Sequence, residues 1–220
     1  MQFDSICVSI GEQSYTGILA ALEKVSFAEI RLDVSRITES EIESVFSSGK
    51  RLIATCREGF YSRRERMDRL VRAIRSGAAF VDVETESDGD FRDFIAEQAG
   101  LTGCKRIISY HNFETTPSLS GMCAIVDTCK KQGADIVKLV TTANSKSDSA
   151  RVLSLYDIYS DSLVAFAMGE TGLITRLACI FLGAPYTYAA VSDDKPLAGG
   201  QISAERIGNA INNLKLKGNE

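Results

Sequence analysis

The sequence predicts an α/β fold, a single (β/α)8 barrel of the TIM type that spans residues 1–220. Eight short apolar runs alternate along the chain with amphipathic helical segments, and this alternation is typical of a parallel barrel. The 220 residues, 45% of them hydrophobic, are enough for one well-filled core, and no linker-like stretch divides them. An open doubly wound sheet is the main alternative. Six strands usually suffice for that fold, however, and the first βα turn, 9–13, lacks a G-x-G-x-x-G motif.

The predicted strands are four to seven residues long and carry mostly β-branched, aromatic or other apolar side chains. In chain order they span 6–10, 27–33, 51–56, 80–86, 106–111, 135–141, 162–168 and 188–191. The predicted helices repeat apolar residues every three to four positions. They span 14–25, 40–48, 63–76, 90–99, 119–132, 147–159, 174–182 and 204–214.

Charge and composition exclude several classes of partner. The net charge of −4 comes from 25 basic and 29 acidic residues mixed along the chain, which leaves no extended basic field for nucleic acid. No apolar run approaches the ~20 residues that cross a bilayer, and the first residues do not resemble an export signal. We therefore expect a soluble, cytoplasmic protein that binds neither nucleic acid nor membrane.

The cysteines and the single histidine argue against a metal site. The six cysteines form no C-x-x-C pair and several lie in apolar runs, so buried reduced thiols are expected. With one histidine, a metal would have to bind carboxylates, and the sequence has no compact motif of that kind. We expect neither a metal nor a cofactor.

Charged residues alternate with apolar ones in two of the predicted strands. A period of two places Glu29, Arg31 and Asp33 on one face of the second strand, and the fourth strand repeats this pattern over 80–86. If the barrel is right, the charged faces point inward, where they must pair with one another, with other polar groups or with a polar ligand. Antiparallel strands with one solvated face would alternate in the same way, but the intervening helical segments argue against hairpins.

His111 and Lys138 are the two candidates for proton transfer and nucleophilic attack. His111 closes the fifth strand, and imidazole is the side chain whose ordinary pKa lies in the physiological range. A solitary histidine is more often structural, so its neighbours matter. Lys138 lies inside the next apolar strand, where desolvation lowers the pKa of a lysine and frees its amine to attack a carbonyl. The pair indicates imine chemistry, with His111 moving a proton.

Two arginines at the predicted rim indicate an anionic small molecule. Arg57 and Glu58 follow the third strand, and Arg176 lies in the first turns of the helix after the seventh. Barrel active sites lie at this C-terminal rim, and a guanidinium binds a carboxylate through two hydrogen bonds.

Six segments, taken in order, resemble those of type I 3-dehydroquinate dehydratases. The second strand reads E-x-R-x-D at 29–33, and R-E-G follows at 57–59. The sequences S-Y-H-N-F at 109–113 and D-I-V-K at 135–138 are the most specific part. Two further matches complete the set, M-G followed by T-R within 168–176 and G-Q-I at 200–202.

The resemblance implies dehydration of 3-dehydroquinate to 3-dehydroshikimate through a Schiff base, in the shikimate pathway of aromatic amino-acid biosynthesis. Lys138 would attack the C3 ketone, His111 would transfer protons, and Glu58 would orient His111. Arg176 would hold the substrate carboxylate and Met168 would pack beside the ring. The remaining contacts would be made to hydroxyl groups by Glu29, Arg31, Arg57 and Gln201, with Ser9 as a weaker polar contact. The resemblance also implies a homodimer.

The chain departs from the family pattern at two loops. Arg57 and Glu58 are adjacent, whereas several residues usually separate the arginine from the E-G pair. Leu197 stands where a substrate-contacting serine is usual, and the preceding turn, 193–196, has the composition of a mobile lid.

Two other functions fit parts of this pattern. A lysine-dependent aldolase would also form an imine, and glycines at 169, 172, 199 and 200 lie where a barrel binds phosphate. A barrel that binds a shikimate-like ligand without turnover would tolerate the two departures. The order of the motifs disfavours the first reading, and retention of both Lys138 and His111 disfavours the second.

Overall fold

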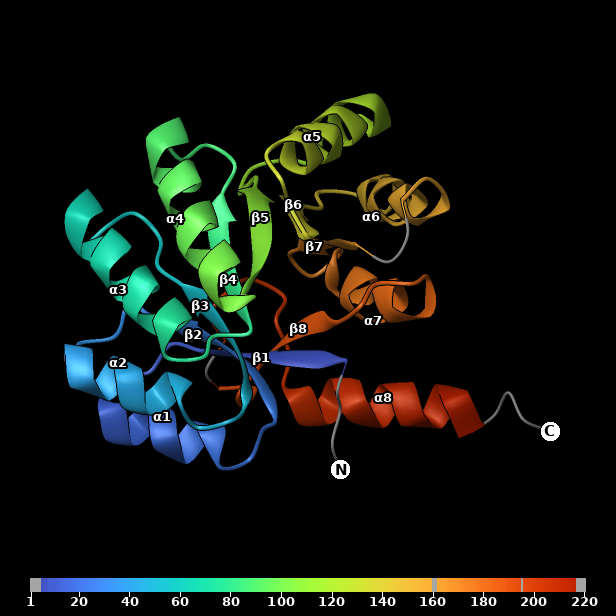
Figure 1. Cartoon of the computed structure of the whole chain (residues 1–220). Helices are drawn as coiled ribbons and strands as arrows, with labels where there is room; N and C mark the ends of the chain where they lie inside the picture. The colour runs from blue at the N-terminus through green and yellow to red at the C-terminus, as the bar shows by residue number, and fades with distance from the viewer. Residues whose placement is uncertain (1–4, 160–161, 195, 217–220) are drawn as a thin grey trace. The chain divides into compact units, whose positions relative to one another are not determined.

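A computed structural model describes residues 5–159, 162–194 and 196–216. Eight strands alternate with eight α-helices along these residues, as Figure 1 shows. The strands are β1 (Ile6–Ile10), β2 (Phe27–Arg31), β3 (Arg51–Thr55), β4 (Phe80–Glu84), β5 (Lys105–His111), β6 (Ile136–Thr142), β7 (Leu163–Met168) and β8 (Thr187–Ala190). The helices are α1 (Tyr15–Leu22), α2 (Glu39–Phe46), α3 (Arg63–Arg75), α4 (Gly89–Thr102), α5 (Leu119–Lys131), α6 (Lys146–Leu153), α7 (Leu173–Phe181) and α8 (Ala204–Leu216), and a 3-10 turn, η1 (Ser154–Asp157), follows α6.

The strands form one sheet in which sequence neighbours are also hydrogen-bonded neighbours, in the order β7-β6-β5-β4-β3-β2-β1-β8. The pairs β2–β3, β3–β4, β4–β5 and β6–β7 are parallel. This pairing excludes the antiparallel hairpins that the alternating charges also allowed, and the predicted (β/α)8 fold class is confirmed. No helix in the described part of the chain is long and apolar enough to cross a membrane.

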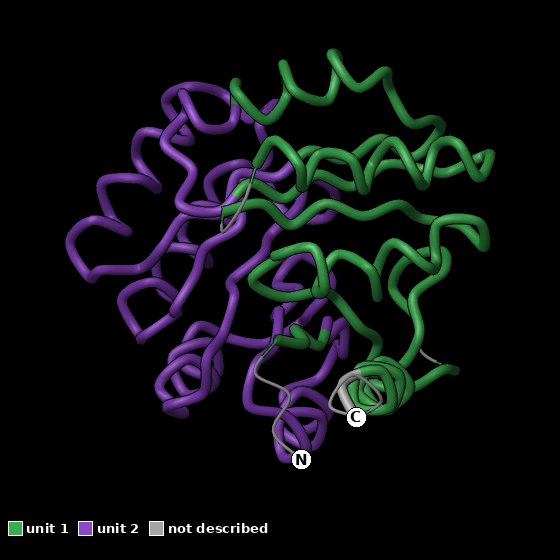
Figure 2. Tube along the Cα trace, turned by 90° about the vertical axis from the view of Figure 1, so that its right-hand side faces the viewer, with its two compact units in different colours: residues 1–8, 110–128, 137–220 green, residues 9–109, 129–136 purple. Residues whose placement is uncertain are grey.

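The chain divides into two compact units, which Figure 2 colours separately. Unit 1 contains residues 1–8, 110–128 and 137–220, and unit 2 contains residues 9–109 and 129–136. Strand β5 passes from unit 2 into unit 1 after Ser109. The expectation of a single domain over 1–220 stays a prediction.

Unit 2 carries β2, β3 and β4 with α2, α3 and α4 side by side against them (Figure 1). The strands are buried almost throughout. Helices α2 and α3 each begin with a capping box, in which Thr38 or Ser62 accepts a backbone hydrogen bond and a glutamate three residues later bonds back. These caps satisfy N–H groups that the first helical turn leaves unpaired.

Unit 1 carries β6, β7 and β8 with α5 to α8. Every residue of β7 is buried, as expected for a parallel strand covered on both faces. One core cluster joins Ile6 and Ala189 of the strands to Ile207 and Ile211 of α8.

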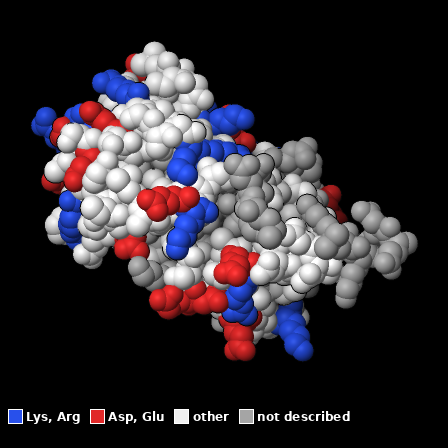
Figure 3. All heavy atoms as spheres, turned by 90° about the horizontal axis from the view of Figure 1, so that it is seen from below, with Lys and Arg blue, Asp and Glu red and all other residues white. Residues whose placement is uncertain are grey.

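On the face drawn in Figure 3, basic and acidic side chains are interspersed between large uncharged areas.

Two strands, β2 and β4, end two residues earlier than predicted. β2 stops at Arg31 because the chain turns there, with the Val34 amide donating to the Arg31 carbonyl, so Asp33 lies beyond the strand. β4 stops at Glu84 because the Ser87 amide closes a turn on the Glu84 carbonyl. The prediction that the strands continue to residues 33 and 86 is therefore wrong, although Asp33 still faces Arg31.

Candidate active site

The residues predicted for the site are divided between the two units. Ser9, Glu29, Arg31, Arg57 and Glu58 belong to unit 2, whereas His111, Lys138, Met168, Arg176 and Gln201 belong to unit 1.

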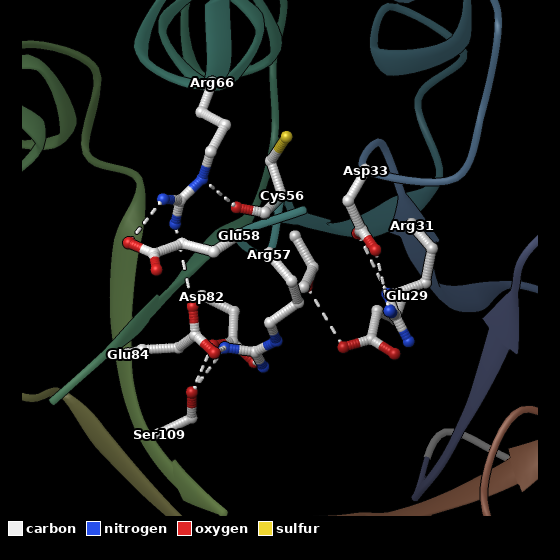
Figure 4. A network of polar contacts seen from close by, with 11 residues as sticks. Glu29, Arg31, Asp33, Cys56, Arg57, Glu58, Arg66, Asp82, Glu84 and Ser109 are labelled. Atoms are coloured by element: carbon white, nitrogen blue, oxygen red, sulfur yellow. Dashed lines mark hydrogen bonds and ion pairs between the residues drawn. The ribbon is translucent and has the colours of Figure 1, made fainter. Parts of the chain in front are cut away.

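In unit 2, the inward charges of β2 are paired within the protein (Figure 4). The Thr55 hydroxyl of β3 donates to Glu29 at 3.0 Å. Arg31 donates to both oxygens of Asp33, at 3.0 and 2.7 Å. Burial lowers the pKa of Arg31, but the hydrogen bond to Asp33 and the charges of Glu29 and Asp33 outweigh this and raise it above its ordinary value. The predicted need for polar partners is thus met by Thr55 and Asp33.

Arg57 occupies the centre of a second buried network, also drawn in Figure 4. Its guanidinium donates to the Ser109 hydroxyl and to Asp82, both at 2.9 Å, and lies 3.5 Å from Glu84. The Ser109 hydroxyl in turn donates to Asp82 at 2.6 Å. Sequence reasoning did not assign Asp82, Glu84 or Ser109 to the site. The alternation of charged and apolar residues in the fourth strand, 80–86, was the sequence signal that could have identified Asp82 and Glu84.

Glu58 lies at the surface, with 79% of its side chain exposed, and pairs with the buried Arg66 at 3.0 Å. Arg66 also donates to the Cys56 carbonyl at 3.0 Å and lies 3.6 Å from Glu84. Helix α3 thereby holds the loop that follows β3, a role for Arg66 that the sequence did not indicate. Ser9, near the end of β1, is buried.

In unit 1, Lys138 lies in the middle of β6 with only 5% exposure. Its ammonium nitrogen is 4.0 Å from the centroid of the Tyr188 ring on β8. A cation over an aromatic face is attracted by the ring quadrupole, an interaction that strengthens as water is excluded. The predicted placement of a lysine inside an apolar strand is correct.

His111 ends β5, and hydrogen bonds tie the chain that follows it to β6. The Asn112 amide donates to the Val140 carbonyl at 2.8 Å, and the Thr142 hydroxyl donates to the Asn112 carbonyl at 3.1 Å. The imidazole stacks on Phe113 with the ring centroids 6.0 Å apart. The end of the strand that carries His111 is thereby fastened to the strand that carries Lys138.

Arg176 of α7 is buried, with 1% exposure, and has few protein partners. Its Nη2 reaches the Gly199 carbonyl at 3.5 Å, and its guanidinium carbon lies 4.3 Å from the Phe166 ring centroid. Its Nε has no hydrogen-bond partner within the described ranges. Burial lowers the pKa of Arg176 to about 10, so it remains a cation at neutral pH. A buried, poorly compensated guanidinium of this kind is suited to bind an anion.

Met168 and Gln201 are both buried in unit 1. Met168 ends β7, directly before the loop that leads to Arg176. The Gln201 side-chain carbonyl accepts a hydrogen bond from the Leu197 amide at 2.9 Å, which closes a turn over 197–201. The possible lid at 193–196 includes Lys195, which lies outside the described residues.

Unit 1 holds a buried amine, Lys138, and a buried guanidinium, Arg176, which are groups of the kinds that form imines and bind anions. Within 5–159, 162–194 and 196–216, no group of three or more His, Cys, Asp or Glu side chains could hold a metal ion. All six cysteines are free, and five of them are buried.

Comparisons with known proteins agree with this chemistry. The family model for type I 3-dehydroquinase matches residues 6–217. A 3-dehydroquinate dehydratase of Desulfotalea psychrophila is 34% identical over 94% of this chain and 96% of its own. The solved 3-dehydroquinate dehydratase of Aquifex aeolicus has a TM-score of 0.78 at 26% identity, covering 95% of this chain and 96% of its own. A type I enzyme from Clostridium difficile shares the fold with a TM-score of 0.85 at 22% identity, covering 97% and 93%. The chain belongs to the type I 3-dehydroquinase family.

Proposed function

We propose that the chain is a hydro-lyase that converts 3-dehydroquinate to 3-dehydroshikimate and water, with Lys138 as the Schiff-base lysine. The Lys138 amine adds to the C3 ketone, and loss of water from the carbinolamine leaves a protonated imine. His111 removes the C2 proton, which the imine makes acidic, and an enamine forms. His111 then returns a proton to the departing C1 hydroxyl, and water hydrolyses the new imine. The balance is one substrate, one product and one water, with Lys138 and His111 regenerated.

The observation that carries this proposal is the presence of a buried lysine, Lys138, and a buried guanidinium, Arg176, in one unit. Lys138 and Arg176 both lie on aromatic rings, and Arg176 has an Nε without a hydrogen-bond partner in the described chain. 3-Dehydroquinate offers a ketone to an amine and a carboxylate to a guanidinium. Binding would compensate the buried charge of Arg176, which supports its assignment to the carboxylate.

The other site residues are assigned to the remainder of the substrate. Met168 packs beside the ring, Glu58 orients His111, and the hydroxyl contacts fall to Ser9, Glu29, Arg31, Arg57 and Gln201. The partners of Arg31 and Arg57 within the protein orient both guanidiniums before substrate arrives, which reduces the entropy that binding must overcome.

The glycine-rich loops of unit 1 do not favour an aldolase that binds a phosphate. The Gly169 amide donates to the Gly199 carbonyl at 3.3 Å. A Cβ added to Gly200 would lie 2.5 Å from the Gly169 carbonyl oxygen. These glycines allow two backbone segments to touch, whereas a phosphate cup needs amides directed at the ligand.

Turnover by a lysine variant tests the proposal. Formation of 3-dehydroshikimate, followed by its enone absorbance, should fall by a factor on the order of 10⁴ in Lys138→Ala, because the electron sink is lost. Lys105→Ala, which removes an exposed lysine at the start of β5, should keep full activity. Substantial turnover by Lys138→Ala would contradict the assignment. A wild-type protein that binds quinate without turnover would instead support a non-catalytic binding barrel.

His111→Ala separates the proton-transfer role from imine formation. The variant should still form some imine, while proton abstraction slows by a factor on the order of 100 or more. The measurement is single-turnover enone formation set beside the amount of imine trapped by borohydride. Full activity would remove His111 from the mechanism.

We also infer a homodimer, as the family resemblance implies, and a location in the cytoplasm. Light scattering coupled to gel filtration would measure the mass, for which twice 23.9 kDa is expected. A monomeric mass over the working concentration range would contradict the dimer.

A further inference from the structure

We propose that the Tyr188 ring is a positioning residue for the reaction, holding the Lys138 nitrogen while it is a cationic imine. The inference rests on the proposed role of Lys138. Its basis is a pair of neighbouring rings, Phe166 of β7 and Tyr188 of β8, called here the aromatic platform.

The Tyr188 ring lies directly at the nitrogen that reacts. The distance from the Lys138 Nζ to the ring centroid is 4.0 Å, well inside the ~6 Å reach of a cation–π contact. Tyr188 is only 2% exposed, so water does not screen the attraction strongly. Both partners lie on strands, which restricts how far either side chain can shift.

Neighbouring rings hold the Tyr188 ring in place. Tyr186 meets its edge at a centroid distance of 5.5 Å and an angle of 64°, and Phe166 packs against it at 6.0 Å and 52°. Tilted and edge-on contacts of this kind are favourable geometries for aromatic pairs. The ring therefore presents a fixed face to Lys138.

The platform also supports the second cation of the unit. The Arg176 guanidinium carbon lies 4.3 Å from the centroid of Phe166, the ring in contact with Tyr188. The two cations assigned to the ketone and the carboxylate of the substrate thus rest on adjoining rings. The aromatic platform therefore fixes the distance between the Lys138 nitrogen and the Arg176 guanidinium, the two groups proposed to bind the substrate.

The contribution of Tyr188 is expected to grow once the imine has formed. A lysine ammonium has three N–H donors, whereas a protonated imine nitrogen retains one. Hydrogen bonds can therefore compensate the charge less well after the amine has reacted. An aromatic face requires no N–H group to attract a cation, so it remains a partner for the imine. Only an interaction that is stronger in the transition state than in the ground state accelerates the chemical step, and a cationic imine that relies more on the ring than the ammonium did meets that condition.

A fluorinated series at position 188 tests this inference at nearly constant ring shape. Tyr188→Phe keeps the ring and should retain activity within about twofold. Replacing that phenylalanine with its mono-, di- and trifluoro forms weakens the negative face of the ring step by step. The logarithm of the imine fraction trapped by borohydride should fall with each fluorine, to a loss on the order of tenfold for the trifluoro form. kcat should fall in parallel.

The affinity for quinate is the control, because a purely structural role of the Tyr188 ring would change the Kd of quinate. Quinate has the carboxylate but no ketone, so it engages Arg176 without forming an imine. Its Kd should stay constant across the fluorinated series. Tyr188→Leu should lose imine and kcat at least as strongly as the trifluoro form.

The outcomes separate this inference from the proposed function. Absence of a wild-type adduct on Lys138 would refute the proposed function itself. A normal wild-type adduct together with an unchanged imine fraction across the series would overturn the role of the Tyr188 face alone. Loss of imine already in Tyr188→Phe would also overturn it, because the hydroxyl rather than the ring face would then matter.

Discussion

Arginines that are buried or partly buried have different partners in the two units. In unit 2, Arg31, Arg57 and Arg66 each face carboxylates within 4 Å. In unit 1, Arg176 lies on an aromatic ring, and a backbone carbonyl at 3.5 Å is its one hydrogen-bond acceptor within the described part of the chain. A paired charge is compensated before substrate arrives, whereas a charge on a ring is compensated only in part. The contrast supports the proposal that Arg176 binds the negative charge of the substrate.

Among the variants that test this contrast, Arg176→Met should have the largest effect on activity. Removing the guanidinium that binds the substrate carboxylate should lower kcat/KM by a factor on the order of 10³, chiefly through KM. Steady-state kinetics on 3-dehydroquinate measure this. A change of less than about tenfold would assign the carboxylate to another residue.

Stability should respond in opposite directions to the same substitution in the two units. Arg57→Met leaves the buried Asp82 without its cation and should lower the free energy of unfolding by about 3 kcal/mol. Arg176→Met removes a buried, poorly compensated charge, so stability should be unchanged or about 1 kcal/mol higher. Urea denaturation of both variants checks this. Equal destabilisation would mean that the two arginines are compensated alike.

Glu58→Gln tests whether this surface carboxylate acts on His111. If it orients His111, kcat should fall about tenfold, KM should stay constant, and the acidic limb of the pH profile should move. Loss of the pair with Arg66 should by itself cost less than about 1 kcal/mol of stability, because Glu58 is largely exposed and Arg66 keeps its contacts with Glu84 and the Cys56 carbonyl. An unchanged kcat and pH profile would show that Glu58 does not orient His111 and pairs only with Arg66.

The smallest expected effect is a pH dependence of quinate binding. Because the pKa of Arg176 is lowered to about 10, its positive charge is complete at pH 7 and is lost as pH rises through 10. The Kd of quinate should be constant from pH 7 to 9 and weaken about fourfold by pH 10.5. The lowered pKa also means that the charged form costs folding free energy at neutral pH, and that this cost declines as pH rises past 10. Calorimetric titration measures the Kd, and Arg176→Met should show no such dependence.

Much of the fold could be predicted because it depends on local patterns. Period-two and period-3.6 repeats placed all eight strands and eight helices in order. The ends of β2 and β4 could not be predicted, because backbone turns at 31–34 and 84–87 stop strands whose charge alternation continues.

The candidate site was predictable where one residue departs from its surroundings. Lys138 in an apolar strand and the single histidine at a strand end were visible in this way. Tyr188, Phe166 and Ser109 were not, because an aromatic or a serine in a strand is ordinary. Their roles depend on which side chains the neighbouring strands bring against them. Arg66 was missed for a similar reason, since its contacts with Glu58 and Cys56 reach back from a helix to a loop.

Peptide mapping after borohydride reduction tests the central claim, that the lysine held on the ring is the one that reacts. The protein is incubated with 3-dehydroquinate and borohydride, its intact mass is measured, and the modified peptide is sequenced. The proposal predicts one adduct per chain, on Lys138, and none in Lys138→Ala. An adduct on a different lysine, or no adduct in a protein that turns substrate over, would contradict it.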